Sequence, residues 1–398
     1  MRTERLAAIA GIHEFPRRTA NGLSALQIKA ESAARALEDA GLEWADVDAL
    51  YDAGESGPGA GLMIAEYLNV RPRVVDTTSV GGSSFEFHAA HAARALAAGR
   101  ARVALLTYGS TAHSDARAIG TGGWTGQAAL PAANMELAYG LTLVGNYALV
   151  ARRHMHQYGT TPEQLAEIAV TTRAHAMRNP EAVQGLVDIG QKDVREIGVE
   201  DVLASRMIAD PLHLFECCII SDGGGAVVMV APPAVRDVRT RPVWVIGAGE
   251  AVGYGENDGD LTVSAAARSG PAAFGEAGVR PDEVDVAMIY DSFTITVLTM
   301  LEDLGFCPKG EGGAYVEGGA LRFDRPGRPA LNTDGGGLSS NHPGMRGIFL
   351  LIEATRQLRG QSCSQVANAQ LAVAHGNGGQ LATRHAGGTI VLASEGRP

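Results

Sequence analysis

The stretch Gly41-Leu-Glu-Trp-Ala-Asp-Val-Asp-Ala-Leu-Tyr-Asp52 has a similar counterpart later in this chain. Its second copy, longer by two residues, is Gly278-Val-Arg-Pro-Asp-Glu-Val-Asp-Val-Ala-Met-Ile-Tyr-Asp291. Each copy follows an Ala-rich helical pattern that ends at the glycine, and each closes with a short apolar strand that runs into Tyr-Asp. Two copies of one unit indicate an internal duplication, so the sequence predicts two halves of similar fold.

The same order of elements surrounds both copies. The first half is expected to contain a strand (4–15), a helix (24–40), the repeated strand (47–52), a further strand (74–78), a glycine turn (79–84), a second helix (85–98) and a closing strand (101–108). Their counterparts in the second half are an opening strand, the repeated strand, a strand-turn-helix unit and a closing strand, at residues 243–249, 278–291, 330–358 and 370–374. Strands that alternate with helices predict an α/β fold, in which each half supplies one sheet and its helices.

Two further features divide the chain. Pro232-Pro233 and the charged run from Arg236 to Arg241 predict a linker between an N-terminal half, residues 1–235, and a C-terminal half, residues 242–398. Much of the segment from 110 to 220 has no counterpart in the second half, and it opens with a region rich in Gly, Ala and Thr. We therefore expect an inserted loop domain at about residues 110–220.

Composition limits the classes of function. The 398 residues carry a formal net charge of −11, which argues against nucleic acid as a partner because phosphate binding depends on Lys and Arg. No segment approaches ~20 uninterrupted apolar residues, so we expect a cytoplasmic protein that does not interact with membranes. The four cysteines form no C-x-x-C pair, and His88 and His91 lack a third ligand at suitable spacing. The sequence therefore predicts no metal site in this chain.

The stretch Gly335-Gly-Gly-Leu-Ser-Ser-Asn-His-Pro-Gly344 is the first candidate for a functional site. Successive glycines allow the backbone to approach a ligand closely, and His342 stands just before an apolar helical run, Gly347 to Leu358, where free N–H donors are expected. A plain strand-to-helix turn with a surface histidine explains the same residues. The stretch by itself leaves both interpretations open.

The chain resembles the thiolase superfamily, specifically the sterol carrier protein X-type thiolases. The residues that carry this resemblance are Tyr158-Gly-Thr-Thr-Pro-Glu-Gln-Leu-Ala-Glu-Ile-Ala-Val170, Asn179-Pro-Glu-Ala182, Ala209-Asp-Pro-Leu-His-Leu214 and Ser221-Asp-Gly-Gly-Gly-Ala226. The resemblance covers nearly the whole chain. It implies a five-layered αβαβα arrangement of two duplicated halves with a loop-domain insertion, a homodimer, and substrates that are thioesters of coenzyme A (CoA).

The active-site segments of the family differ in this chain. Thiolases place a nucleophilic Cys in a turn before a helix, and the matching position here is Ser79. A serine hydroxyl is a poor nucleophile without an activating base, so Ser79 is interpreted either as a catalytic-position residue or as a helix N-cap. Tyr290, in Tyr-Asp-Ser-Phe, takes the place of a catalytic Asn or His of the family.

The same resemblance identifies two histidines as candidate catalytic residues. His342, preceded by Asn341 and followed by Pro343, matches the family's catalytic histidine, and His375, in His-Gly-Asn-Gly-Gly, stands in the segment of its acid/base Cys. Both are predicted as catalytic residues, together with Asn341. The N–H groups of the glycine turns are expected to bind the CoA thioester; the glycines concerned are Gly82, Gly337, Gly378 and Gly379.

Without the Cys, the resemblance points to the thiolase-like aldolases of steroid side-chain breakdown. It implies retro-aldol cleavage of a β-hydroxyacyl-CoA without an acyl-enzyme, in lipid, steroid or aromatic degradation, and a small partner subunit with an OB-fold and a zinc ribbon. One departure is Ser340, because these aldolases have a second catalytic tyrosine there. The alternatives are thiolysis of a bulky or aromatic β-ketoacyl-CoA by an acyltransferase, and a non-catalytic acyl-CoA-binding subunit.

Overall fold

The computed structural model describes residues 5–53, 60–116, 142–254, 260–381 and 384–397. The strands are β1 (Ala7–Glu14), β2 (Ala49–Asp52), β3 (Val74–Asp76), β4 (Val103–Ser110), β5 (Met207–Ala209), β6 (Leu212–His213), β7 (Gly223–Val230), β8 (Val243–Tyr254), β9 (Val286–Ile289), β10 (Ala330–Leu331), β11 (Leu371–Gln380) and β12 (Arg384–Ser394). The α-helices are α1 (Ala25–Ala40), α2 (Ala60–Tyr67), α3 (Ser84–Ala97), α5 (Leu143–Tyr158), α6 (Pro162–Ala176), α7 (Pro180–Asp188), α8 (Val199–Ala204), α9 (Ala266–Ala277), α10 (Thr294–Asp303), α11 (Gly312–Val316), α12 (Gly336–Ser339) and α13 (Gly347–Arg359).

The strand order confirms the duplication. The N-terminal half contributes β3-β2-β4-β7-β1 and the C-terminal half β10-β9-β11-β12-β8, which is the same order of equivalent strands. The prediction of one separate sheet per half was wrong in one respect, because β1 and β8 pair antiparallel through Ala7, Ala8 and Ile9 and join the two sets into one ten-stranded sheet. This pairing satisfies backbone groups that two separate sheet edges would leave open.

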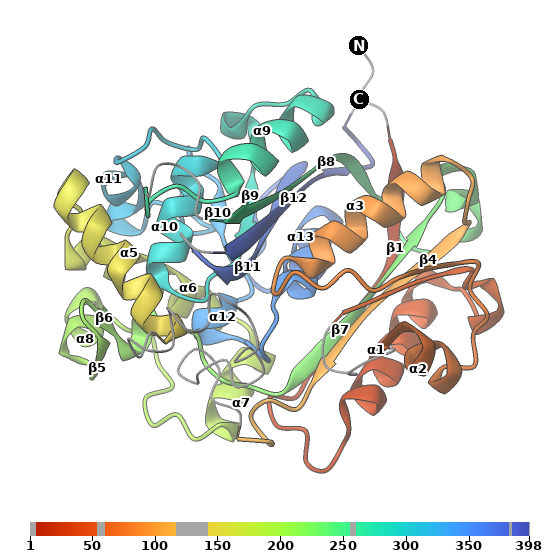
Figure 1. The fold of residues 1–398 in the computed structure, drawn as a ribbon, viewed down its shortest axis with the longest axis horizontal. Helices are drawn as coiled ribbons and strands as arrows, with labels where there is room; N and C mark the ends of the chain where they lie inside the picture. Colours follow the sequence, from red (N-terminus) through yellow and green to blue (C-terminus); the bar gives the residue numbers. More distant parts are fainter. Residues whose placement is uncertain (1–4, 54–59, 117–141, 255–259, 382–383, 398) are drawn as a thin grey trace.

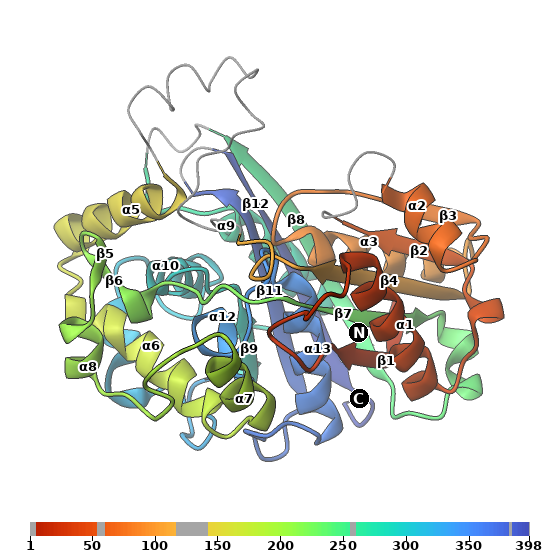
Figure 2. The same ribbon diagram turned by 90° about the horizontal axis from the view of Figure 1, so that it is seen from below.

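Five layers stack in the order helix, strand, helix, strand, helix (Figures 1 and 2). Helix α1 packs on β1, β4 and β7 as one outer layer, and α9 packs on β8 and β12 as the other. Helices α3 and α13 contact strands of both halves and so form the central layer. Their side chains are buried nearly all round, as expected of helices enclosed between two sheets. The start of each central helix is therefore placed close to the other half.

The described helices between β4 and β7 lie on one side of the molecule, beside α10, α11 and α12 (Figure 1). The segment between these two strands contains α5, α6, α7, α8 and the two-stranded β5–β6 ribbon, and α6 packs against α10, α11 and α12 of the C-terminal half. Part of the predicted loop domain, residues 117–141, lies outside the described residues. The described helices therefore pack the inserted segment against helices of the C-terminal half.

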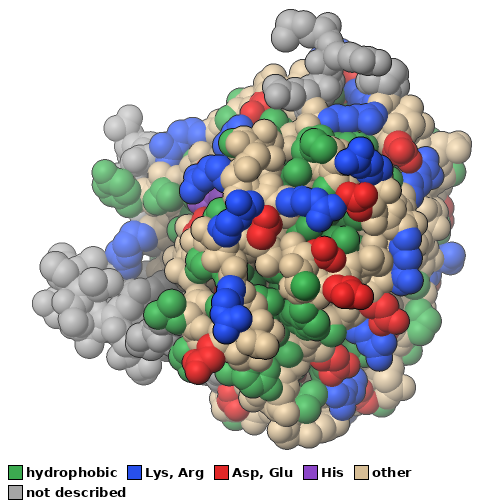
Figure 3. Space-filling model, turned by 90° about the vertical axis from the view of Figure 1, so that its right-hand side faces the viewer, with side chains coloured by type: hydrophobic (Ala, Val, Ile, Leu, Met, Phe, Trp, Pro, Cys, Tyr) green, Lys and Arg blue, Asp and Glu red, His purple; other side chains and the backbone are tan. Residues whose placement is uncertain are grey.

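The surface carries mixed charge. On the face shown in Figure 3, Lys and Arg alternate with Asp and Glu, and no large field of one sign is visible. In the part of the chain that the structure describes, no helix is both long enough and apolar enough to cross a membrane.

Candidate active site

Two of the predicted glycine turns and Tyr290 are in direct contact. A Cβ added to Gly82 would lie 2.2 Å from Cε2 of Tyr290 and 2.5 Å from the carbonyl oxygen of Asn377. A Cβ added to Gly378 would lie 1.7 Å from the carbonyl oxygen of Val80. Only glycine fits at these two positions, so the turn after β3 and the turn on β11 pack backbone to backbone beside the Tyr290 ring.

Tyr290 and His342 form a buried pair. The Tyr290 hydroxyl lies 3.0 Å from Nε2 of His342, and the two rings meet edge to face with centroids 5.5 Å apart. Tyr290 directly follows β9, and its N–H donates to the carbonyl of His375 at 2.9 Å. The N–H of His342 donates to Oγ of Ser221 at 3.0 Å, and Nδ1 of its ring has no partner among the described residues. These bonds hold the backbones of Tyr290 and His342, and the Tyr290 hydroxyl faces Nε2 of His342.

Burial keeps both members of the pair uncharged. It raises the pKa of the Tyr290 phenol well above its usual value of 10, with a further contribution from Cys218. Burial, followed by the positive charge of Arg346, lowers the pKa of His342 from 6.5 to about 3. At neutral pH the pair is therefore a phenol beside a neutral imidazole, which is able to accept a proton.

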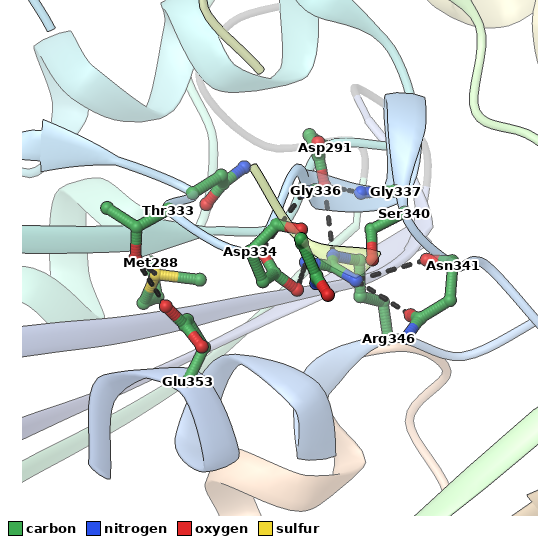
Figure 4. A network of polar contacts seen from close by, with 12 residues as sticks. Met288, Asp291, Thr333, Asp334, Gly336, Gly337, Ser340, Asn341, Arg346 and Glu353 are labelled. Atoms are coloured by element: carbon green, nitrogen blue, oxygen red, sulfur yellow. Dashed lines mark hydrogen bonds and ion pairs between the residues drawn. The ribbon is translucent and has the colours of Figure 1, made fainter. Parts of the chain in front are cut away.

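A buried ion network holds the loop that carries His342 (Figure 4). The Arg346 guanidinium contacts Asp334 at 2.6 Å and Asp291 at 3.2 Å, and it donates to the Oδ1 of Asn341 at 2.7 Å. The Asp291 carboxylate also accepts the N–H of Gly337 at 2.8 Å. The side chains of Arg346, Asp334 and Asp291 are at most 1% exposed. The single guanidinium therefore offsets only part of the negative charge of the two buried carboxylates, and burial raises the pKa of Asp291 to about 6. These contacts hold the loop in place.

Asn341 is part of this network rather than of the Tyr290–His342 pair. Its Nδ2 donates to Oε1 of Glu14 at 2.5 Å, while its Oδ1 accepts from Arg346. Both ends of the amide are occupied by protein groups. The geometry therefore gives Asn341 the task of positioning the loop, and direct contact with substrate stays a prediction.

The structure does not bring the ring of His375 to the pair. Strand β11 was expected to end at residue 374 but continues to Gln380, so side chains keep alternating between the two faces of the sheet. The His375 ring is hydrogen-bonded through Nδ1 to Oγ1 of Thr389 at 2.8 Å and borders Gly387. Burial lowers the pKa of His375 to about 3. Only its backbone carbonyl contacts the site.

The predicted CoA-binding glycines have their space taken by protein atoms. Gly82 and Gly378 are closed by the contacts described above, a Cβ on Gly337 would lie 3.1 Å from Oδ1 of Asp291, and one on Gly379 would lie 2.2 Å from the carbonyl oxygen of Arg384. Close packing of the site therefore accounts for the glycines. Contact of their N–H groups with a thioester stays a prediction.

Ser79 is exposed in the turn after β3, and its interpretation as a helix N-cap was wrong. The N-cap of α3 is Ser83, and the turn is closed by Ser84, whose Oγ accepts the N–H of Val80 and donates to the carbonyl of Gly81. Within the described residues, no hydrogen bond joins the Ser79 hydroxyl to a histidine or a carboxylate. The hydroxyl thus lacks the base that would activate it.

Replacing Ser79 by Ala should therefore leave kcat within about threefold of the wild-type value, because an unactivated surface hydroxyl contributes little. Steady-state assay of Ser79→Ala checks this. A loss of activity by orders of magnitude, together with an acyl adduct on Ser79 in the intact protein mass, would restore covalent catalysis.

Tyr108 is a functional residue that the sequence did not reveal. It lies in β4, and its hydroxyl donates to the carbonyl of Pro343 at 2.6 Å and accepts the N–H of Met345 at 3.0 Å. The N-terminal half thereby holds the turn that follows His342. No local pattern marks this role, because the partners are more than 230 residues away in the chain.

Cys218 does not replace the missing nucleophilic cysteine. The N–H of Cys218 donates to the carbonyl of Ser292 at 2.9 Å, so this residue lies beside the Tyr-Asp-Ser-Phe segment. Burial raises its pKa above the usual value of 9, and it stays a neutral thiol. Among the described residues there is also no group of three potential metal ligands.

Comparisons with known proteins place this geometry in a family. The model of the thiolase C-terminal domain-like family matches residues 252–393. A steroid side-chain-cleaving aldolase of Thermomonospora curvata is 34% identical over 374 residues, which cover 90% of this chain and 92% of the relative. An acetyl-CoA acetyltransferase of Methanothermobacter thermautotrophicus is 34% identical over 364 residues, which cover 88% of this chain and 90% of the relative.

A solved structure agrees with these relatives. The Ltp2-ChsH2(DUF35) aldolase superposes with a TM-score of 0.85 at 30% identity and covers 98% of both chains. The fold, the duplicated strand order and the 34% identity to two relatives over nearly the whole chain all agree. The chain therefore belongs to the thiolase superfamily, as a thiolase-like enzyme of the aldolase type.

Proposed function

We propose that this chain cleaves the Cα–Cβ bond of a β-hydroxyacyl-CoA by a retro-aldol reaction. The observation that carries the proposal is the buried Tyr290–His342 pair, a neutral acid beside a neutral base, next to a turn whose Ser79 lacks activation. The two relatives reported above are equally identical and differ in named activity, so the site decides between them. For the acyl group we propose a bulky one such as the steroid side chain named for the aldolase relative.

The pair supplies the proton transfers. The β-hydroxyl of the substrate gives its proton to the phenol oxygen of Tyr290, while the phenol proton moves to Nε2 of His342, which requires the tautomer protonated at Nδ1. The Cα–Cβ bond breaks, its electron pair passes into the thioester as an enolate, and a carbonyl forms at Cβ. The pair then returns the proton to Cα. No oxidant, water or free CoA is consumed.

Charge balance explains why a histidine of low basicity suffices. Burial disfavours the imidazolium of His342 while the site is neutral. The enolate creates a negative charge in the same low-dielectric space, and the attraction between the two charges offsets the desolvation. Proton uptake by His342 is thereby coupled to bond cleavage.

The value of kcat/KM should be constant between pH 6.5 and 9.5. An imidazole whose pKa is about 3 is already deprotonated at pH 6.5, and a phenol whose pKa lies well above 10 is still protonated at pH 9.5. The pH profile of kcat/KM checks this. A decrease of about twofold at pH 6.5, where an ordinary histidine is half protonated, would show that His342 titrates at its unshifted pKa.

A side-by-side assay tests the reaction type. The protein, purified with any subunit that accompanies it, is incubated with a β-hydroxyacyl-CoA without CoA and, separately, with the matching β-ketoacyl-CoA plus CoA. The proposal predicts an aldehyde or ketone and a shortened acyl-CoA in the first mixture. Turnover in the second mixture alone would identify thiolysis, which the acetyltransferase relative favours as the second candidate. Binding without turnover of either would indicate the non-catalytic subunit.

We further propose two protein partners. The similar solved structure is named as an aldolase of Ltp2 with ChsH2(DUF35), and this second component supports the predicted heterocomplex with an OB-fold zinc-ribbon subunit. A gene for such a subunit beside this one, and co-purification of its product, test that partner.

A homodimer is supported by exposed apolar side chains on α2 and on β3, which is an edge strand of the sheet; they are Leu62, Met63, Tyr67 and Val75. Light scattering of the purified protein tests the dimer.

A further inference from the structure

Retro-aldol cleavage requires the enzyme to act on two substrate oxygens at the same time. The β-hydroxyl must lose its proton, and the thioester oxygen must carry the negative charge of the enolate. The hydroxyl of Tyr290 and Nε2 of His342 contact each other and act on a single proton. The other oxygen therefore requires a hydrogen-bond donor outside this pair, a requirement that rests on the proposed reaction.

Tyr147 places a second buried phenol beside the active-site segments. It lies on α5 of the inserted segment, is 1% exposed, and stacks on Phe293 with ring centroids 4.7 Å apart. Phe293 closes the Tyr-Asp-Ser-Phe segment that begins with Tyr290. The phenol groups of Tyr147 and Tyr290 are close enough for the charge of one to raise the pKa of the other. Tyr147 is thus held against the segment that begins with Tyr290 but comes from another part of the chain.

The hydrogen bonds of Tyr147 leave its proton available. Its oxygen accepts from Nδ2 of Asn377 at 2.7 Å, and the backbone carbonyl of Asn377 borders Gly82 and the Tyr290 ring. The phenol donates to the carbonyl oxygen of Gly379, but the two oxygens are 3.5 Å apart, which is the outer limit of a hydrogen bond. The Ser292 hydroxyl and the backbone N–H of Leu381 also donate to the phenol oxygen. A substrate oxygen at normal hydrogen-bond distance would replace the long contact.

Burial favours the form of Tyr147 that can donate. It raises the pKa of this phenol to about 12, although the hydrogen bond from Asn377 acts in the opposite direction. The hydroxyl is therefore protonated throughout the physiological range. The Asn377 amide polarises it further, because a hydroxyl that accepts a hydrogen bond is a better donor.

We propose that Tyr147, supported by Asn377, donates a hydrogen bond to the thioester oxygen and stabilises the enolate that forms on cleavage. Tyr147 keeps its proton throughout, so the balance of the reaction is unchanged. The site would then combine a residue of the inserted segment with residues of both halves. The aldolase activity would depend on how α5 docks on the C-terminal half.

Tyr147→Phe tests this role in the complete enzyme, with any co-purifying subunit present. The variant keeps the ring that stacks on Phe293 and removes only the hydroxyl. We expect kcat to fall by about 10²-fold, the scale for loss of one oxyanion donor, with a smaller change in KM because the hydrogen bond strengthens as charge develops. Tyr51→Phe, which removes another buried phenol hydroxyl from β2, is the matched control and should stay within about twofold of wild type.

The outcomes separate this role from the reaction itself. Wild-type enzyme that fails to cleave β-hydroxyacyl-CoA without CoA overturns the proposed reaction and the role together. Normal wild-type cleavage with a Tyr147→Phe kcat within about threefold overturns the role of Tyr147 alone. Thermal unfolding of both Phe variants verifies that they fold. If Tyr147→Phe does not fold, Asn377→Ser replaces it; a fall in kcat of about tenfold supports the role, and unchanged kcat overturns it.

Discussion

Replacing Tyr290 by Phe should lower kcat by about 10²-fold or more, the usual scale for a positioned acid/base group. The change removes the hydroxyl that lies 3.0 Å from Nε2 of His342 and through which the substrate proton is proposed to pass. It leaves the ring to fill the space beside Gly82. Steady-state kinetics with a β-hydroxyacyl-CoA measure the effect, and His342→Ala should give a loss of the same order.

The matched control is again Tyr51→Phe, which removes a buried hydroxyl from β2, where the ring contacts His88 rather than the Tyr290–His342 pair. A decrease shared by both variants would reflect general destabilisation. Retention of more than about a third of wild-type kcat by Tyr290→Phe would contradict the proposed proton transfer.

Replacing Arg346 by Met should lower the free energy of unfolding by about 3–5 kcal/mol, because it leaves buried carboxylates without their counter-charge. Arg346 lies between Asp334 and Asp291, and it also binds the backbone and side-chain oxygens of Asn341. Denaturant unfolding measures the change. Activity should fall as well, since the loop that carries His342 loses its main support.

Arg236→Met provides the comparison. The Arg236 side chain is 85% exposed, and it lies 3.9 Å from Asp237, so its loss should change the free energy of unfolding by less than about 0.5 kcal/mol. Equal effects of the two substitutions would show that burial of the Arg346 network does not determine its contribution to the free energy of unfolding.

The duplicated fold was predictable because the repeat is local and strong. Strand β2, which ends in Tyr51-Asp52, and strand β9, which precedes Tyr290-Asp291, occupy equivalent places in the two strand sets, as the repeat indicated. The junction of the sets through β1 and β8 was not predictable, because pairing of distant edge strands leaves no local pattern. Ser83 as the N-cap of α3 was also missed, since Ser79, Ser83 and Ser84 all suit a cap by composition.

The site was predictable only in part. Tyr290 and His342 were predicted from their positions in the active-site segments of the family, and the structure brings them together. The sequence did not show the direction of the His375 side chain, because the glycines at 376, 378 and 379 predict a turn where β11 continues to Gln380. Tyr108 and Tyr147 have local surroundings typical of a strand and of an amphipathic helix, and only tertiary contacts connect them to the site.

The most direct test of the account is the stoichiometry of cleavage in the absence of free CoA. Enzyme and β-hydroxyacyl-CoA are mixed after removal of CoA, and the carbonyl fragment and the shortened acyl-CoA are quantified together by mass spectrometry. The account predicts equal amounts of both over many turnovers, with no acylated protein. No cleavage until CoA is added, followed by formation of two acyl-CoA products from a β-ketoacyl-CoA, would contradict it.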